Sequence, residues 1–130
     1  MNHPGNCLGY RVAARSKTMV YLCDNEITDN NPQYRRRLTD FIHDAEVVVA
    51  DAQYVPDDFP AKAGWGHSRY TDVVDVAMDA NVHHLMLTHH DPDRSDEALD
   101  GIVESSRCRI AKRGSDMHVA AAAEGMALYL

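Results

Sequence analysis

Two adjacent histidines, His89 and His90, stand between an apolar run and Asp91. The preceding residues 82–88 are typical of a buried strand, because they form a short apolar stretch bounded by turn-forming residues. In open α/β sheets, ligands bind in the crevice outside the carboxyl ends of the strands. Imidazole and carboxylate side chains placed there can hold a catalytic metal ion. The spacing therefore predicts chemistry at the end of this strand, with His89 as the ligand and His90 behind it or facing solvent.

Four further residues could reach the same edge. Asp24 and Asp51 each directly follow an apolar, strand-like segment, and His3 and His67 lie in segments expected to be loops. Neutral imidazoles and carboxylates are ligands of zinc and manganese, and a carboxylate between two metal ions can bridge them. Such a site lowers the pKa of a water molecule to about 7 and polarises a phosphoryl or carbonyl oxygen. This mixture of side chains therefore suits a hydrolase.

Residue periodicity predicts the elements that would position these side chains. Alternating or continuous apolar runs predict strands at residues 8–14, 18–23, 46–50, 82–88, 117–122 and 126–130, with Ser16-Lys17 as the turn of the first hairpin. Apolar residues at helical spacing predict helices at about 32–44, 69–80 and 96–113, the second capped by Ser68 and the third by Ser95. Residues 55–66 are a predicted loop, because prolines and glycines interrupt them.

The order of these elements, ββαβαβαββ, contains two strand-helix-strand units with parallel strands. Crossovers of this kind are right-handed, which places their helices on the same side of the sheet. The predicted fold class is therefore α/β, with a mixed sheet and helices mainly on one face. At 130 residues the chain is long enough for one domain with a core and too short for two, so residues 1–130 should form a single domain.

Charge and composition exclude several classes of protein. The formal net charge is -7, which argues against a general nucleic-acid or anionic-membrane binder because such proteins need a basic face. The three cysteines have no CxxC spacing, so neither a disulfide framework nor a zinc knuckle is indicated. No segment approaches the roughly 20 apolar residues of a membrane span, and no secretory leader is recognisable. We expect a cytoplasmic protein with no membrane association.

Five segments carry a resemblance to known proteins: His3-Pro4-Gly5-Asn6-Cys7-Leu8-Gly9-Tyr10-Arg11, Tyr21-Leu22-Cys23-Asp24, Ala50-Asp51-Ala52-Gln53-Tyr54, Gly64-Trp65-Gly66-His67-Ser68 and Leu87-Thr88-His89-His90-Asp91-Pro92. In this order and spacing they resemble successive motifs of the metallo-β-lactamase superfamily. The group they resemble most is the phosphodiesterase branch that includes ribonuclease Z and cyclic-phosphate hydrolases. The resemblance extends over nearly the whole chain.

The resemblance implies a metal-dependent hydrolase of phosphodiester substrates. His3, Asp24 and His89 match metal ligands of the superfamily, with Asp24 as the bridging carboxylate. His67 matches a histidine that contacts the scissile phosphate and assists proton transfer, and Asp51 matches an acidic residue that orients it. The implied cofactor is a divalent metal, zinc first and manganese or iron as alternatives.

One motif of the superfamily, HxHxDH in its N-terminal half, has no match in the sequence. The chain therefore resembles only the C-terminal half of an αββα sandwich. Three ligands divided over two metal positions leave neither with the three or four that a stable zinc site has. Metal binding by this chain alone is accordingly expected to be weak or absent.

A half sandwich would expose the sheet face that normally packs on the other half, and a large exposed apolar patch marks an interface. The expected partner is a second copy of the chain or a separate N-terminal half. An alternative function follows: a non-catalytic interaction or assembly module that keeps the half-fold without a working metal centre. Metal content separates this alternative from the hydrolase.

Overall fold

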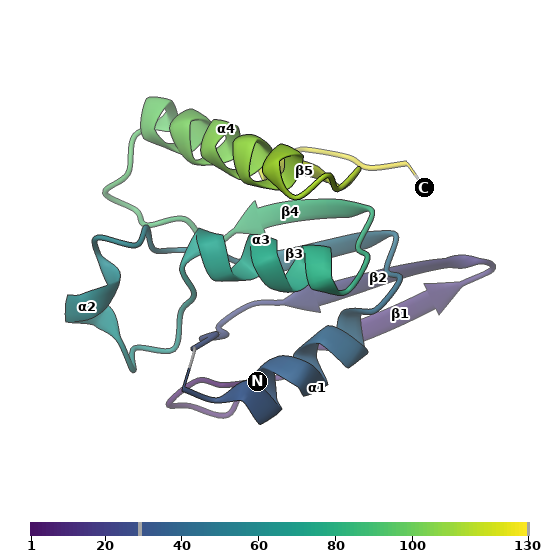
Figure 1. Ribbon diagram of the computed structural model, residues 1–130, viewed down its shortest axis with the longest axis horizontal. Coiled ribbons are helices and arrows are strands. Elements are labelled where there is room, and N and C mark those ends of the chain that lie inside the picture. Colours follow the sequence, from purple (N-terminus) through teal and green to yellow (C-terminus); the bar gives the residue numbers. More distant parts are fainter. Residues whose placement is uncertain (29, 130) are drawn as a thin grey trace.

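One five-stranded sheet runs through the protein, with its strands in the order β1-β2-β3-β4-β5 (Figure 1). The computed structural model describes residues 1–28 and 30–129. The strands span Tyr10–Ala14 (β1), Lys17–Leu22 (β2), Val47–Asp51 (β3), His84–Thr88 (β4) and His118–Ala121 (β5). β1 and β2 form an antiparallel hairpin, and β2 to β5 run parallel. The predicted mixed sheet is confirmed.

Three long helices cover one face of the sheet (Figure 1), namely α1 (Pro32–Ile42), α3 (Tyr70–Asp79) and α4 (Asp96–Lys112). α1 begins after Asn31, whose side chain accepts a hydrogen bond from the backbone N–H of Tyr34 at 3.0 Å. α4 begins after Ser95, whose hydroxyl accepts one from the backbone N–H of Ala98 at 3.3 Å. Both caps satisfy a donor that the first helical turn leaves unpaired. The predicted placement of the helices and the predicted Ser95 cap are confirmed.

The core lies between the helices and the sheet. Because strand side chains alternate in direction, every second residue of β2, β3 and β4 faces the helices. The facing residues pair in register across the three strands as Val20, Val48 and Leu85 in one row and Leu22, Ala50 and Leu87 in the next. All six are at most 4% exposed. Full burial of one large aliphatic side chain contributes about 1.5–3 kcal/mol, so these rows anchor the strands whose ends carry the polar residues.

The opposite face of the β1–β2 hairpin is open. Tyr10 and Val12 of β1 pair with Tyr21 and Met19 of β2, and strand alternation directs these side chains away from the face that Val20 and Leu22 turn to the helices. These four residues are 56%, 52%, 40% and 38% exposed in that order. We term this group of four apolar side chains the open face.

The hairpin turn lies one residue earlier than predicted. Ala14 and Lys17 are the last paired residues, so the turn consists of Arg15 and Ser16 rather than Ser16 and Lys17. Arg15 has a φ of 56°, the left-handed conformation that tight hairpin turns use. Arginine is not a typical residue for that conformation, so the local sequence did not indicate it.

Ser68 does not cap α3, which was the prediction. The N-cap is Arg69, and no side chain makes a capping hydrogen bond there. The Ser68 hydroxyl instead donates to the carbonyl of Asn25 and accepts from the backbone N–H of Ile27 at 3.1 Å. A contact across the fold has replaced the local one, because it satisfies backbone groups of a buried segment.

Two other segments also differ from the prediction. The predicted loop 55–66 contains a short helix, α2 (Phe59–Lys62). The first of the two predicted final strands is present as β5, but residues 126–129 form no strand, and Leu130 lies outside the described residues. An apolar run becomes a strand only where its backbone can pair with the edge of a sheet. None of the helices in the described ranges is long and apolar enough to cross a membrane.

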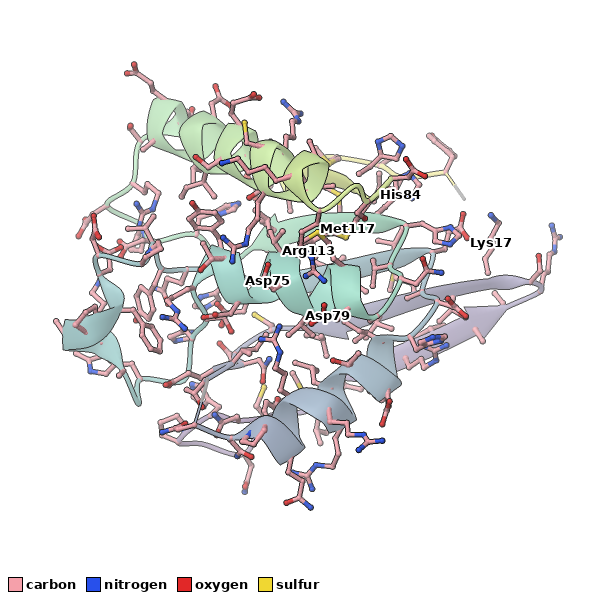
Figure 2. All side chains as sticks on the ribbon, viewed as in Figure 1. Lys17, Asp75, Asp79, His84, Arg113 and Met117 are labelled. Carbon is pink, nitrogen blue, oxygen red and sulfur yellow. The ribbon has the colours of Figure 1, made fainter. Side chains whose placement is uncertain are left out.

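Asp79 ties α3 to the two helices beside it. Its carboxylate accepts hydrogen bonds from Arg35 of α1 at 3.1 Å and from Arg113, the C-cap of α4, at 2.7 Å. Figure 2 shows Asp79 and Arg113 on the helical side of the molecule. Burial by itself raises the pKa of Asp79, but the hydrogen bonds from Arg113 and Arg35 outweigh it and hold the pKa below its usual value.

This lowered pKa predicts a loss of stability in acid. The folded state holds the Asp79 proton more weakly than the unfolded chain does. The stabilisation by the ionised Asp79 carboxylate is therefore present above the unfolded pKa of about 3.9, and it is lost as the pH falls through the lower folded pKa. The unfolding free energy of the wild type should fall between about pH 7 and about pH 3. In Asp79→Asn this fall should be smaller, by less than about 1 kcal/mol because the Asp79 side chain is 35% exposed. Urea unfolding measures this. Asp100→Asn, an exposed aspartate of α4, is the control, and equal changes in both variants would contradict the assignment.

Candidate functional site

The carboxyl ends of β2, β3 and β4 lie side by side, and a polar residue stands at each. Asp24 follows β2, Asp51 is the last residue of β3, and His89 follows β4. Asp24 and His89 have φ values of 54° and 56°, in the left-handed region that non-glycine residues seldom adopt. Such a conformation persists only where the surrounding structure holds it, and it frequently marks a functional position.

The Asp51 carboxylate is buried and contacts His67 directly. Asp51 Oδ2 and His67 Nδ1 are 2.6 Å apart, and the two side chains are 0% and 15% exposed. The carboxylate also accepts hydrogen bonds from the backbone N–H groups of Asn25 and Gln53, each at 3.2 Å. An ionised carboxylate can only accept, so the proton of this pair lies on Nδ1 of His67. In the neutral ring of this tautomer, Nε2 is the acceptor atom.

His89 completes the arrangement from the other side. Its ring stacks on that of His67, with centroids 4.5 Å apart and an interplanar angle of 15°. His89 Nε2 lies 3.4 Å from Asp24 Oδ1, and these two side chains are 36% and 40% exposed. Asp24, Asp51, His67 and His89 thus form one group, which we term the four-residue cluster.

A divalent metal ion fits the four-residue cluster. One ligand atom from each residue lies within 4.8 Å of the other three. Ligand atoms of one zinc ion are about 3.4 Å apart, so the spacing in the cluster is of the right order, although the 2.6 Å contact between Asp51 and His67 would have to open for both to bind. Two carboxylates and two neutral imidazoles are a donor set that zinc and manganese take. Nδ1 of His89 is also buried without a hydrogen-bond partner in the part of the chain that the structure describes.

His3 lies beside the four-residue cluster but is not a member of it. Its ring centroid is 5.6 Å from that of His67, at an interplanar angle of 66°. Its Nδ1 accepts a hydrogen bond from the backbone N–H of Gly5 at 3.0 Å. The structure thus brings four of the five predicted site residues together and places the fifth next to them. The individual roles of these residues stay predictions.

The surroundings of His90 differ from those of His89. Burial lowers the pKa of His90, and a hydrogen bond with the backbone of Ala122 opposes this only in part. Asp91 accepts a hydrogen bond from the backbone of Asp93 and another from Lys62 at 3.0 Å, and both lower its pKa. The two residues therefore brace the turn after β4 rather than extend the four-residue cluster.

Glu26 is a residue that sequence reasoning missed. It is only 4% exposed, and its carboxylate oxygens accept the backbone N–H groups of Gly64 at 2.9 Å and Gly66 at 2.8 Å. Its own backbone pairs with Asn2, which is next to His3. One buried carboxylate thus joins the N-terminal segment to the loop that carries His67. The partners are 24 and 38 residues away or more, so no local pattern reveals them.

A cleft of about 780 Å³ opens beside His3. Its walls include Asn2, Glu26, Phe59, Gly64 and Arg69. Arg69 also makes an ion pair with Asp72 and lies over the Phe59 ring, 4.6 Å from its centroid. A space large enough for part of a small substrate therefore lies beside His3, which in turn lies next to the four-residue cluster.

Comparison with known proteins extends these observations. The sequence profile described as "Beta-lactamase superfamily domain" matches residues 1–90, which include the whole four-residue cluster. The fold is similar to the crystal structure of the metallo-beta-lactamase fold protein YhfI from Bacillus subtilis, with a TM-score of 0.71 and 22% sequence identity. That similarity covers 95% of this chain and 44% of YhfI, so the chain spans less than half of that protein's length. No curated protein matches the sequence significantly.

The two glycines around Trp65 form a matched pair for mutation. Both have positive φ, 87° for Gly64 and 96° for Gly66, so an alanine costs about 1–2 kcal/mol of backbone strain at either. A Cβ on Gly64 meets nothing within 4 Å, whereas one on Gly66 would lie 2.2 Å from Cδ2 of His3. Gly66→Ala should therefore lower the unfolding free energy clearly more than Gly64→Ala and displace His3. Urea unfolding and the His3 ring signals in NMR spectra test this, and equal effects of the two variants would refute the packing described here.

Proposed function

Because the chain belongs to the beta-lactamase superfamily, we propose that it is a metal-dependent hydrolase of phosphodiester substrates. The observation that carries the proposal is the four-residue cluster, in which the exposed pair Asp24 and His89 offers ligand atoms for an ion and the buried pair Asp51 and His67 lies within 4.8 Å of them. The phosphodiester part rests on the resemblance of residues 64–68 to the phosphodiesterase branch of the superfamily. The hydrolase-like fold itself follows from membership of the superfamily.

Asp24 and His89 are the residues that would hold the metal. They are the more exposed half of the four-residue cluster, and they face each other at 3.4 Å. Zinc, or manganese or iron in its place, would polarise the phosphoryl oxygen and lower the pKa of the attacking water. Two ligands bind an ion weakly, so His3, which is not a member of the four-residue cluster, would have to move toward them to add a third.

His67 would move the proton. The Asp51 carboxylate accepts a hydrogen bond from Nδ1 of His67. This bond fixes the orientation of the ring and leaves Nε2 available to the substrate. From there, Nε2 can take a proton from the attacking water and then, as the N–H of the protonated ring, contact the phosphate and pass that proton to the leaving oxygen. Asp51 acts only through His67, because its oxygens already accept hydrogen bonds from His67, Asn25 and Gln53. It is therefore a positioning residue.

The open face supports a second proposal, namely that two copies of the chain pack through it. Tyr10, Val12, Met19 and Tyr21 expose a continuous set of apolar side chains on one hairpin. The chain covers 44% of the solved structure of YhfI, so two copies together would have close to the length of that protein. An interface of this kind is also what the non-catalytic assembly module would need.

Metal binding and hydrolysis together test the hydrolase. Titration calorimetry with zinc should show a site that Asp24→Asn and His89→Ala weaken by at least about 10- to 100-fold. His67→Ala should keep zinc affinity within about threefold while turnover of bis(p-nitrophenyl) phosphate falls by about 10²- to 10⁴-fold. His118→Ala on β5, a histidine outside the four-residue cluster, should change neither.

Each outcome separates one role from another. Loss of zinc in His67→Ala would make His67 a ligand instead of a proton carrier. A protein that binds no zinc, manganese or iron, and whose properties do not change in Asp24→Asn or His89→Ala, would leave the assembly module as the function.

Sedimentation velocity at micromolar concentration tests the proposed dimer. Met19→Asp places a charge on the open face and should weaken association by about tenfold or more, because a buried unpaired charge is costly. Phe41→Asp is the matched control, since Phe41 is 37% exposed against 38% for Met19 but lies on helix α1, on the opposite side of the sheet. A monomeric wild-type protein would rule the second copy out and direct the search to a separate half of the fold.

A further inference from the structure

Trp65 is the one tryptophan of the chain, and it stays 60% exposed. It stands between Gly64 and Gly66, two residues before His67. Two residues span at most about 7 Å, so the Trp65 backbone lies close to that of His67. A large, exposed aromatic side chain thus belongs to a residue whose backbone lies close to that of His67, a member of the four-residue cluster.

The turn that carries Trp65 is held rigidly. The two oxygens of the buried Glu26 carboxylate accept the N–H groups of Gly64 and Gly66 at 2.9 and 2.8 Å. Both glycines adopt positive φ values that other residues seldom take. A buried carboxylate is costly unless its hydrogen bonds are satisfied, and here those bonds go to the two residues that flank Trp65. The turn is therefore fixed on both sides of the indole.

The N-terminal segment packs against the turn. His3 and Pro4 pack so closely on Gly66 that an added Cβ would lie 2.2 and 2.7 Å from their atoms. Trp65 cannot bury its ring by a collapse of the turn without breaking the Glu26 hydrogen bonds or displacing His3. The exposed ring thus stands on a backbone turn that Glu26 and His3 hold in place. Most of the other exposed large apolar side chains instead belong to the open face or the C-terminal tail.

We propose that Trp65 is a stacking platform for a nucleobase, so that the phosphodiester is that of a nucleotide. This inference rests on the proposed function, because the four-residue cluster takes the phosphate. One exposed ring on a rigid turn suits a single planar group, and base–aromatic stacking is favourable for every base. A lipid phosphodiester would need a broad apolar surface instead. The net charge of -7 disfavours long nucleic acid, which leaves small nucleotides.

Because Trp65 is the only tryptophan, its fluorescence reports directly on its own surroundings. Three probes are titrated into the zinc-supplemented protein: AMP, adenosine and ribose 5-phosphate. Stacking predicts saturable quenching by AMP and adenosine, and none by ribose 5-phosphate. By calorimetry, Trp65→Ala should weaken AMP binding by about tenfold or more and leave ribose 5-phosphate unchanged, while Trp65→Phe should keep part of the AMP affinity. Tyr129→Ala, at a residue that is 96% exposed, is the control for loss of an exposed aromatic.

The outcomes separate this inference from the function on which it rests. Unchanged AMP affinity in Trp65→Ala, or equal affinity of the wild type for AMP and ribose 5-phosphate, overturns the stacking role. Quenching by adenosine as strong as by AMP keeps the stacking role and removes the phosphate from the four-residue cluster. Failure of all three probes to bind overturns the stacking role, whatever bis(p-nitrophenyl) phosphate shows.

Discussion

The buried carboxylate of Asp51 is the constraint around which the site is arranged. A charge at the end of a central strand is costly unless hydrogen bonds satisfy it. Its partners come from three segments: the backbone of Asn25 after β2, the backbone of Gln53 after β3, and the ring of His67 before α3. The need to satisfy Asp51 therefore draws these segments together, and His67 receives its position and tautomer from the same interaction.

The strand ends could be predicted because their signals are local. Apolar alternation indicated β2, β3 and β4, and the parallel order that follows from the crossovers places Asp24, Asp51 and His89 at one edge. Helix caps were predictable only where the capping contact is local, as at Ser95. Ser68 has the same residue type but satisfies the backbone of Asn25 and Ile27 instead. Nothing within a few residues of Ser68 distinguishes the two cases.

The supports of the site could not be predicted for the same reason. Glu26 looks like an ordinary acidic residue after a strand, yet it is 4% exposed and holds residues distant along the chain. Its role depends on burial, which arises only once the N-terminal segment and the loop before α3 have folded against each other. The conformation of Arg15 and the absence of a strand at residues 126–129 likewise depend on pairing partners rather than on residue type.

The four-residue cluster divides into a structural pair and an exposed pair. Asp51 and His67 are 0% and 15% exposed and satisfy each other, so the fold does not need an ion to compensate the buried charge. Asp24 and His89 are 40% and 36% exposed, and water can solvate them when no ion is bound. An ion bound there would stabilise the fold only by its own binding free energy. The fold can therefore persist while the metal affinity varies, which allows both a hydrolase and a metal-free assembly module to use the same backbone.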